Sequence, residues 1–170
     1  MLRRICIAGP LPPPAGGMAN QTEKLAELLR SEGITVGIIQ TNAPYQPAWV
    51  GGIPVLRALF RLFGYWNTLR RELTPQVQLL HIMANSGWSW HLFAVPAILI
   101  AKQRHIPVVL NYRGGYADSF FAKSWTKVSW ALRKCAVIVV PSTFLQQVFN
   151  RYGMEAVIVP NVLDTSLFVP

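Results

Sequence analysis

The sequence is poor in acidic residues. Seven Asp and Glu stand against 16 Lys and Arg in 170 residues, so the formal net charge is +9 although only 14% of the residues are charged. A solvated, positively biased surface accounts for this excess, and so does attraction to an anionic partner such as a membrane surface or a phosphorylated substrate. The basic residues are spread along the chain and form no recognised nucleic-acid-binding module, so we expect no nucleic acid partner.

Cysteine is also scarce. The chain has two, Cys6 and Cys135, and both lie in apolar runs that we expect to form buried strands. Their separation does not match the spacing of metal ligands, and no cluster of Cys, His and Asp accompanies them. We therefore expect two small core residues in a reducing compartment and no bound metal.

Hydrophobic runs long enough to cross a membrane are missing. The longest apolar stretch, Trp88 to Ala101, is interrupted by His91 and Pro96 and falls short of the roughly 20 residues that a bilayer requires. The first residues, Met1 to Arg4, lead into a run that is too short for a secretory signal. We expect a cytoplasmic protein.

Several well-known signatures are absent as well. The chain has neither the G-x-G-x-x-G spacing of dinucleotide sites nor a phosphate-binding P-loop motif. It has no G-x-S-x-G nucleophile, no close carboxylate pair and no Asp-x-Asp signature, which disfavours hydrolysis by the familiar routes. The hydrophobic content of 52% nevertheless predicts one folded domain over residues 1–170.

Six apolar runs predict strands. They lack polar alternation, which is typical of strands covered on both faces, and segments with helical spacing separate them. This alternation predicts an α/β fold with a mostly parallel sheet. Gly33 and Gly153 are expected to end helices, and Ser142 to cap one at its N-terminus. The predicted strands are Ile5–Ala8, Val36–Gln40, Val77–Ile82, Pro107–Tyr112, Ala136–Val140 and Ala156–Val159.

The predicted helices carry apolar residues at helical spacing. They are centred on Leu25 to Leu29, Leu56 to Phe63, Trp88 to Arg104, Trp125 to Leu132 and Leu145 to Phe149. In an open sheet of this kind ligands bind beyond the carboxyl ends of the strands. The loops expected there are Gly9–Met18, Thr41–Pro54, Met83–Gly87, Arg113–Asp118 and Pro141–Thr143.

Gly16 and Gly17 follow the first predicted strand and begin the first predicted helix. Glycine lets a ligand approach the backbone closely, and the free N–H groups of a helix N-terminus favour an anion. The pair therefore predicts a phosphate site. A simple structural turn is the alternative.

The loop after the fourth predicted strand joins Arg113, Gly114, Gly115 and Tyr116 to Asp118. The Arg guanidinium binds phosphate or carboxylate groups, and Tyr offers a flat apolar face with a polar tip. We interpret the segment as a ligand-binding loop, with Arg113 as a candidate catalytic residue. The alternative is an Arg113–Asp118 surface pair in which the glycines form a tight turn.

His81 lies near the end of the third predicted strand, followed by Asn85 and Ser86. An imidazole there could reach a shared cleft as an acid or base, although a structural histidine is the competing interpretation. His91 and His105 lie within or after a predicted helix and are interpreted as structural.

Val55–Arg71 forms a basic and aromatic amphipathic helix. Arg57, Arg61 and Arg71 fall on one side, and Leu56, Leu59, Phe63 and Trp66 occupy another. Such a helix could rest on anionic lipid headgroups. It could equally cover the sheet and expose an ordinary solvated back.

Several segments share a pattern that covers essentially the whole chain. They are Pro12–Gly17, Lys24–Leu29 with Glu32–Val36, Ile106–Leu110, Val140–Ser142, and Val159–Asp164 with Phe168 and Pro170. Together these segments resemble the N-terminal half of retaining GT-B glycosyltransferases of the family-four group. The closing motif is the more specific part, because it resembles the family's Pro-Asn-Gly-Val-Asp followed by Phe and Pro.

The resemblance implies a Rossmann-like three-layer domain that binds the acceptor and faces a second, C-terminal nucleotide-sugar-binding domain, which this chain lacks. It implies a nucleotide diphosphate sugar as co-substrate without a further cofactor, and a glycan or lipid-linked acceptor. By this analogy Gly16 and Gly17 approach the donor diphosphate, while Asn85 and the residues from Arg113 to Tyr116 line the acceptor site. Ser142 and Asn161 match positions at the interdomain cleft or hinge.

The chain departs from the family pattern at two places. Arg113-Gly114 stands where many members have histidine before glycine, and an arginine there favours a charged acceptor. Val162 replaces the usual glycine of the closing motif, which predicts a stiffer hinge. Two alternatives to a transferase remain, namely a stand-alone binder of a phosphorylated ligand and a peripheral domain at the inner face of a membrane.

Overall fold

The structure is a computed structural model that describes residues 3–44 and 54–161, and the side chains from residue 56 onward in the second segment. Six strands alternate with helices along these segments. The strands are β1 (Arg4–Gly9), β2 (Thr35–Gln40), β3 (Leu79–Ala84), β4 (Val108–Tyr112), β5 (Val137–Val140) and β6 (Val157–Ile158). The helices are α1 (Gly17–Ser31), α2 (Pro54–Glu72), the π-helical turn η2 (Trp90–Ala94), α3 (Val95–Gln103), α4 (Ala117–Leu132) and α5 (Thr143–Arg151).

The strands form one parallel sheet in the order β2-β1-β3-β4-β5-β6, which confirms the predicted α/β class. The chain moves from β1 outward to β2, returns past β1 to β3, and continues in that second direction to β6. The carboxyl ends of β1 and β3 therefore mark the point where the strand order reverses. Open α/β sheets bind their ligands at such a point.

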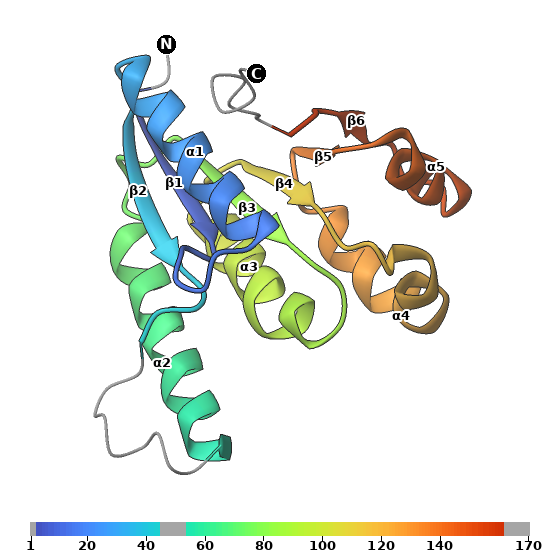
Figure 1. The fold of residues 1–170 in the computed structure, drawn as a ribbon, viewed down its shortest axis with the longest axis horizontal. Coiled ribbons are helices and arrows are strands. Elements are labelled where there is room, and N and C mark those ends of the chain that lie inside the picture. Colours follow the sequence, from blue (N-terminus) through green and yellow to red (C-terminus); the bar gives the residue numbers. More distant parts are fainter. Residues whose placement is uncertain (1–2, 45–53, 162–170) are drawn as a thin grey trace, which may run out of the picture.

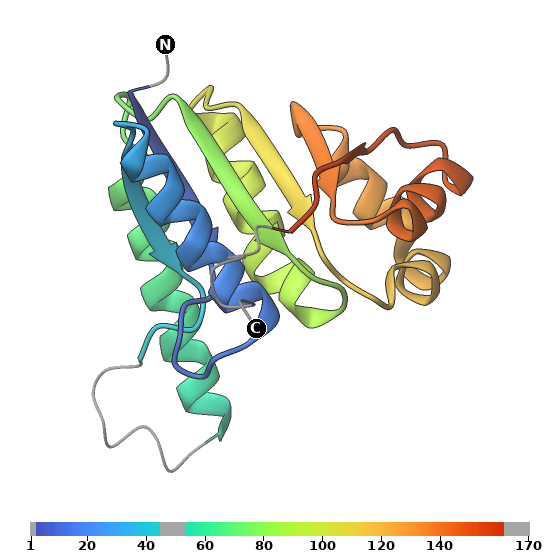
Figure 2. The same ribbon diagram turned by 45° about the horizontal axis from the view of Figure 1, so that its top comes forward.

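The helices are divided unequally between the two faces of the sheet. Parallel crossovers are right-handed, so the single step from β1 to β2 places α1 on one face and every later step places its helix on the other. Figures 1 and 2 show α1 on the face opposite to α2 and α3. The result is the three-layer arrangement that the sequence predicted, with α1 as the only helix on its face among the described residues.

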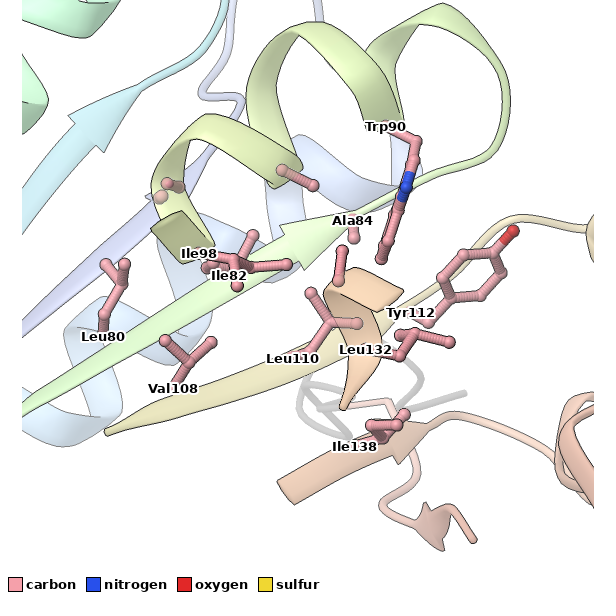
Figure 3. Close-up of a cluster of buried hydrophobic side chains, with 14 of the residues drawn as sticks. Leu80, Ile82, Ala84, Trp90, Ile98, Val108, Leu110, Tyr112, Leu132 and Ile138 are labelled. Atoms are coloured by element: carbon pink, nitrogen blue, oxygen red, sulfur yellow. The ribbon is translucent and has the colours of Figure 1, made fainter. Parts of the chain in front are cut away.

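The larger core lies between the sheet and the helices from α2 to α5. Alternate residues of neighbouring strands, including Leu80, Ile82, Leu110 and Ile138, point into it (Figure 3). Its aromatic part includes Tyr112, whose ring centroid lies 5.4 Å from that of Phe121 and 5.3 Å from that of Phe149. Period-2 alternation places the neighbouring strand residues, among them His81, on the face of α1.

Two local expectations are wrong. The third strand begins at Leu79 rather than Val77 and continues to Ala84, because Val77 is buried from a turn in which its N–H bonds to the Thr74 carbonyl. Cys135 lies between α4 and β5 rather than in a strand, although Cys6 is buried in β1 as predicted. The helix expected from Trp88 to Arg104 is confirmed, since residues 88 and 89 are already helical, the π-turn η2 follows, and α3 ends at Gln103.

The helix ends agree better with the sequence. Gly33 and Gly153 follow α1 and α5 with positive φ values of 79° and 69°, a backbone conformation that glycine adopts without strain. Ser142 caps α5, where its Oγ accepts a hydrogen bond from Leu145 N at 3.4 Å. No helix in the described segments is long and apolar enough to span a bilayer.

Candidate functional site

The N-terminus of α1 opens at the carboxyl end of β1. Gly16 precedes the helix in extended conformation, and the structure shows no side-chain cap hydrogen bond at this end among the described residues. A Cβ built on Gly16 or Gly17 meets no atom within 4 Å, so the space beside both residues is open. The free N–H groups and the helix dipole make this end suitable for an anion.

Asn42 holds the proline-rich loop that leads to this helix. Its side-chain amide accepts a hydrogen bond from Leu11 N at 2.9 Å and donates one to Leu11 O at 2.7 Å. Nδ2 also lies 3.3 Å from Pro13 O. This role of Asn42 was not predicted, and its only signal in the sequence is the position of the asparagine, two residues after a predicted strand end.

The loops that leave β3 and β4 pack directly against one another at Gly114. A Cβ at this buried glycine would lie 2.8 Å from Asn85 Oδ1 and 2.9 Å from Ser86 N, closer than side chains allow. The Ser86 hydroxyl also forms a hydrogen bond of 2.8 Å with the Tyr112 hydroxyl. Gly114 thus serves the contact between the loops, while Asn85, Gly115 and Tyr116 stay exposed and open to a ligand.

Arg113 lies at the exit of β4, one strand away from β3. Its backbone N–H donates to Ala84 O at 2.9 Å, which extends the pairing of the two strands by one residue. Its guanidinium lies 3.4 Å from Asn111 Oδ1 and donates a hydrogen bond to Asn161 Oδ1. Partial burial lowers the pKa of Arg113, but a guanidinium stays charged in proteins.

The Arg113–Asp118 surface pair, which was the alternative to a ligand-binding loop, is not formed. Asp118 instead makes an ion pair with Arg151 of α5 at 3.2 Å. The guanidinium of Arg113 therefore carries a positive charge at the carboxyl edge of the sheet that no carboxylate of the described residues neutralises within ion-pair distance. This leaves it available to an anionic group.

His81 is the third residue of β3 and lies beside Ile7 of β1 and Val109 of β4. Its Nε2 is buried and has no hydrogen-bond partner in the described part of the chain. Burial and, as a smaller cause, the nearby positive charge of Arg113 together lower the pKa of His81 to about 4. The imidazole is neutral near pH 7, and proton transfer is poorly matched to so low a pKa. This favours the structural interpretation of His81.

The two hinge candidates lie at different places. Ser142 is engaged in capping α5, whereas Asn161 reaches the guanidinium of Arg113. Val162, the predicted stiffening residue, lies outside the described residues. Within the described residues no group of three or more His, Cys, Asp or Glu is placed to hold a metal ion.

The structure therefore gathers the predicted residues in two groups at one edge of the sheet. The glycines of α1 lie at the end of β1, and Asn85 with the Arg113 loop lies at the ends of β3 and β4. Because β1 and β3 are neighbours, the two groups flank the strand-order reversal (Figure 2). Together they define a Rossmann-like α/β domain whose carboxyl edge is the candidate site for an anionic ligand.

Comparison with protein families adds the specific identification. The chain belongs to Glycosyltransferase Family 4, whose pattern matches residues 15–167. The match begins at the residue before Gly16 and includes both groups of the candidate site. It confirms the resemblance to the N-terminal domain of GT-B glycosyltransferases. No curated protein gives a significant match to the sequence.

Proposed function

We propose that the chain forms one wall of a cleft in which a sugar passes from a nucleotide diphosphate sugar to a hydroxyl of a glycan or lipid-linked acceptor, with retention of configuration. The observation that carries the proposal is the uncapped N-terminus of α1 beside the strand-order reversal, with a charged arginine two strands away. Membership in a glycosyltransferase family supports the reaction class.

In this proposal the donor diphosphate lies at Gly16 and Gly17. Negative charge develops on the departing diphosphate in the transition state, and fixed backbone N–H dipoles can stabilise it without reorganising. The open space beside both glycines supports the close approach of a phosphate. The main contribution of the chain is then positioning and charge stabilisation.

The acceptor lies along the exit loops of β3 and β4. Tyr116 is 82% exposed and offers a surface for a sugar ring, and the exposed Asn85 amide at the exit of β3 can bind hydroxyl groups. The guanidinium of Arg113 favours an acceptor that carries a phosphate or carboxylate. In this proposal a second domain binds the nucleotide sugar, so we expect the 170 residues alone to be inactive.

The test is a screen of the product of the complete gene for turnover of nucleotide sugars. The same turnover is then measured for the variants Gly17→Val and Arg113→Ala. Gly17→Val puts a side chain into the proposed phosphate position, so the KM for the donor should rise at least about tenfold. Gly64→Val adds the same side chain to another helix position with open space around it and should leave turnover unchanged. Full activity in both site variants would refute the assignment, and ligand binding without turnover would favour a binding module.

A further inference from the structure

Helix α2 is divided into a buried half and an exposed half. Tyr65, Leu69 and Leu73, at and just beyond its C-terminal half, are at most 3% exposed and belong to the main core. No residue from 56 to 64 is buried. The second half therefore anchors the helix to the sheet, and the first half projects beyond the sheet (Figure 1).

The exposed half is strongly apolar. Phe63 is 72% exposed and Leu59 is 56% exposed, and Phe60 and Trp66 are also open to solvent. At 100° per residue these four side chains share about one third of the helix circumference, next to the buried face but separate from it. The sequence left open whether this apolar side covers the sheet, and the structure shows that it does not.

The Trp66 side chain marks the border of this apolar stripe. Its Nε1 lies 3.4 Å from Leu92 O of η2, so its polar atom has a protein partner while its ring stays partly exposed. Next to it the hydroxyl of Tyr65 donates to Phe93 O at 3.0 Å, which fixes the helix against η2. These two hydrogen bonds hold the C-terminal end of the stripe against η2.

Positive charge accompanies the stripe. Helix α2 carries four arginines, Arg57, Arg61, Arg70 and Arg71, and its only acid is Glu72 in the last position. Arg71 is paired with Glu72 at 3.1 Å, whereas Arg57 and Arg70 are exposed. Exposed aromatic and aliphatic side chains with flanking arginines and no acid are typical of helices that bind anionic lipid surfaces.

We propose that the exposed half of α2, comprising Arg57, Leu59, Phe60, Phe63 and Trp66, docks on an anionic lipid bilayer. A second copy of the chain is a poorer occupant, because facing two such helices brings arginines of like charge together. The helix begins at the carboxyl edge of the sheet, where the candidate site lies (Figure 1). Docking there brings the site next to the lipid surface. This docking does not depend on glycosyl transfer.

Flotation of the purified chain with vesicles tests this proposal without any nucleotide sugar, so its outcome is independent of the proposed function. Vesicles of phosphatidylcholine mixed with phosphatidylglycerol should carry the chain upward, and vesicles of phosphatidylcholine alone should carry far less. Arg57→Glu should weaken binding to the mixed vesicles about tenfold or more, since each basic residue near the surface contributes about 1 kcal/mol. The double variant Leu59→Ser/Phe63→Ser should weaken it at least as much.

Two matched variants serve as controls. Phe144 on α5 is 56% exposed, like Leu59, and Lys123 on α4 is an exposed cation outside α2. Phe144→Ser and Lys123→Glu should therefore leave flotation unchanged, and circular dichroism should show that every variant is folded. Absence of binding by the unmodified chain, or equal loss in the control variants, would overturn the proposal. A dimer in light scattering that the α2 variants dissociate, without vesicle binding, would assign the surface to self-association instead.

Discussion

The side chains of Arg113 and Asn161 meet across 48 positions of sequence, and the guanidinium of the first donates to the amide oxygen of the second. The contact ties the exit of β4 to the segment that follows β6. Because Asn161 follows β6, the orientation of Arg113 is coupled to the last described segment of the chain.

A double-mutant cycle measures this coupling. Arg113→Ala and Asn161→Ala should each lower the free energy of unfolding by less than about 1.5 kcal/mol, because the pair is exposed. The double variant should lose less than the sum of the two, with an interaction energy of about 0.5 kcal/mol or more. Urea denaturation followed by fluorescence gives all three values, and strict additivity would show that the contact does not persist in solution.

The close approach at Gly114 predicts a sharp difference between two adjacent glycines. Gly114→Ala places a methyl group against Ser86 N and Asn85, and should destabilise the domain by about 1–3 kcal/mol. Gly115→Ala has no atom within 4 Å and should change stability by less than about 0.5 kcal/mol. Thermal unfolding of both variants checks this, and equal stabilities would mean that the loops separate easily.

The buried imidazole of His81 predicts a loss of stability in acid. Its pKa is near 4 in the folded chain and near 6.5 when unfolded, so the unfolded state binds more protons between these values. The neutral imidazole makes its full contribution to the free energy of unfolding above about pH 6.5, and this contribution is lost progressively toward pH 4. Its size is about 1.4 kcal/mol for each unit by which the folded and unfolded pKa values differ. Urea unfolding of the wild type and of His81→Leu from pH 7.5 to 4.5 should show the flatter profile in the variant. Parallel profiles would contradict the assignment.

Ser142 should behave as a helix cap. Ser142→Ala removes the acceptor of the hydrogen bond from Leu145 N and should lower the free energy of unfolding by about 1 kcal/mol. Ser142→Asp keeps an acceptor at this position and should retain most of the stability that the cap contributes. Chemical denaturation compares the three proteins. A variant with unchanged stability but altered turnover in the complete enzyme would instead favour the hinge role that the family resemblance implies.

The strands were predictable because a parallel sheet covered on both faces leaves uninterrupted apolar runs, such as those that became β1, β4 and β5. The error at the start of β3 has a physical cause. The apolar side chain of Val77 is explained by its burial, and Val77 does not pair with a neighbouring strand. The glycines at the start of α1 were also found from local pattern.

The contacts between distant segments were not predictable from the sequence. No local sequence pattern indicates that Gly114 packs against Ser86 or that Asn42 binds the loop at Leu11. The same holds for the contact of Arg113 with Asn161. Each of these depends on which strands become neighbours. The apolar side of α2 was correctly located, but only the packing of Tyr65 and Leu69 decided which way it faces.

Tyr112 joins the interior of the domain to the rim where the candidate site lies. Its ring packs on Phe121 and Phe149 in the core, while its hydroxyl holds Ser86 in the loop after β3. A substitution of Phe149, deep in α5, is therefore expected to displace the Ser86 loop through the ring of Tyr112. Variants that disturb this rim before the domain unfolds are to be sought among the interior aromatic residues.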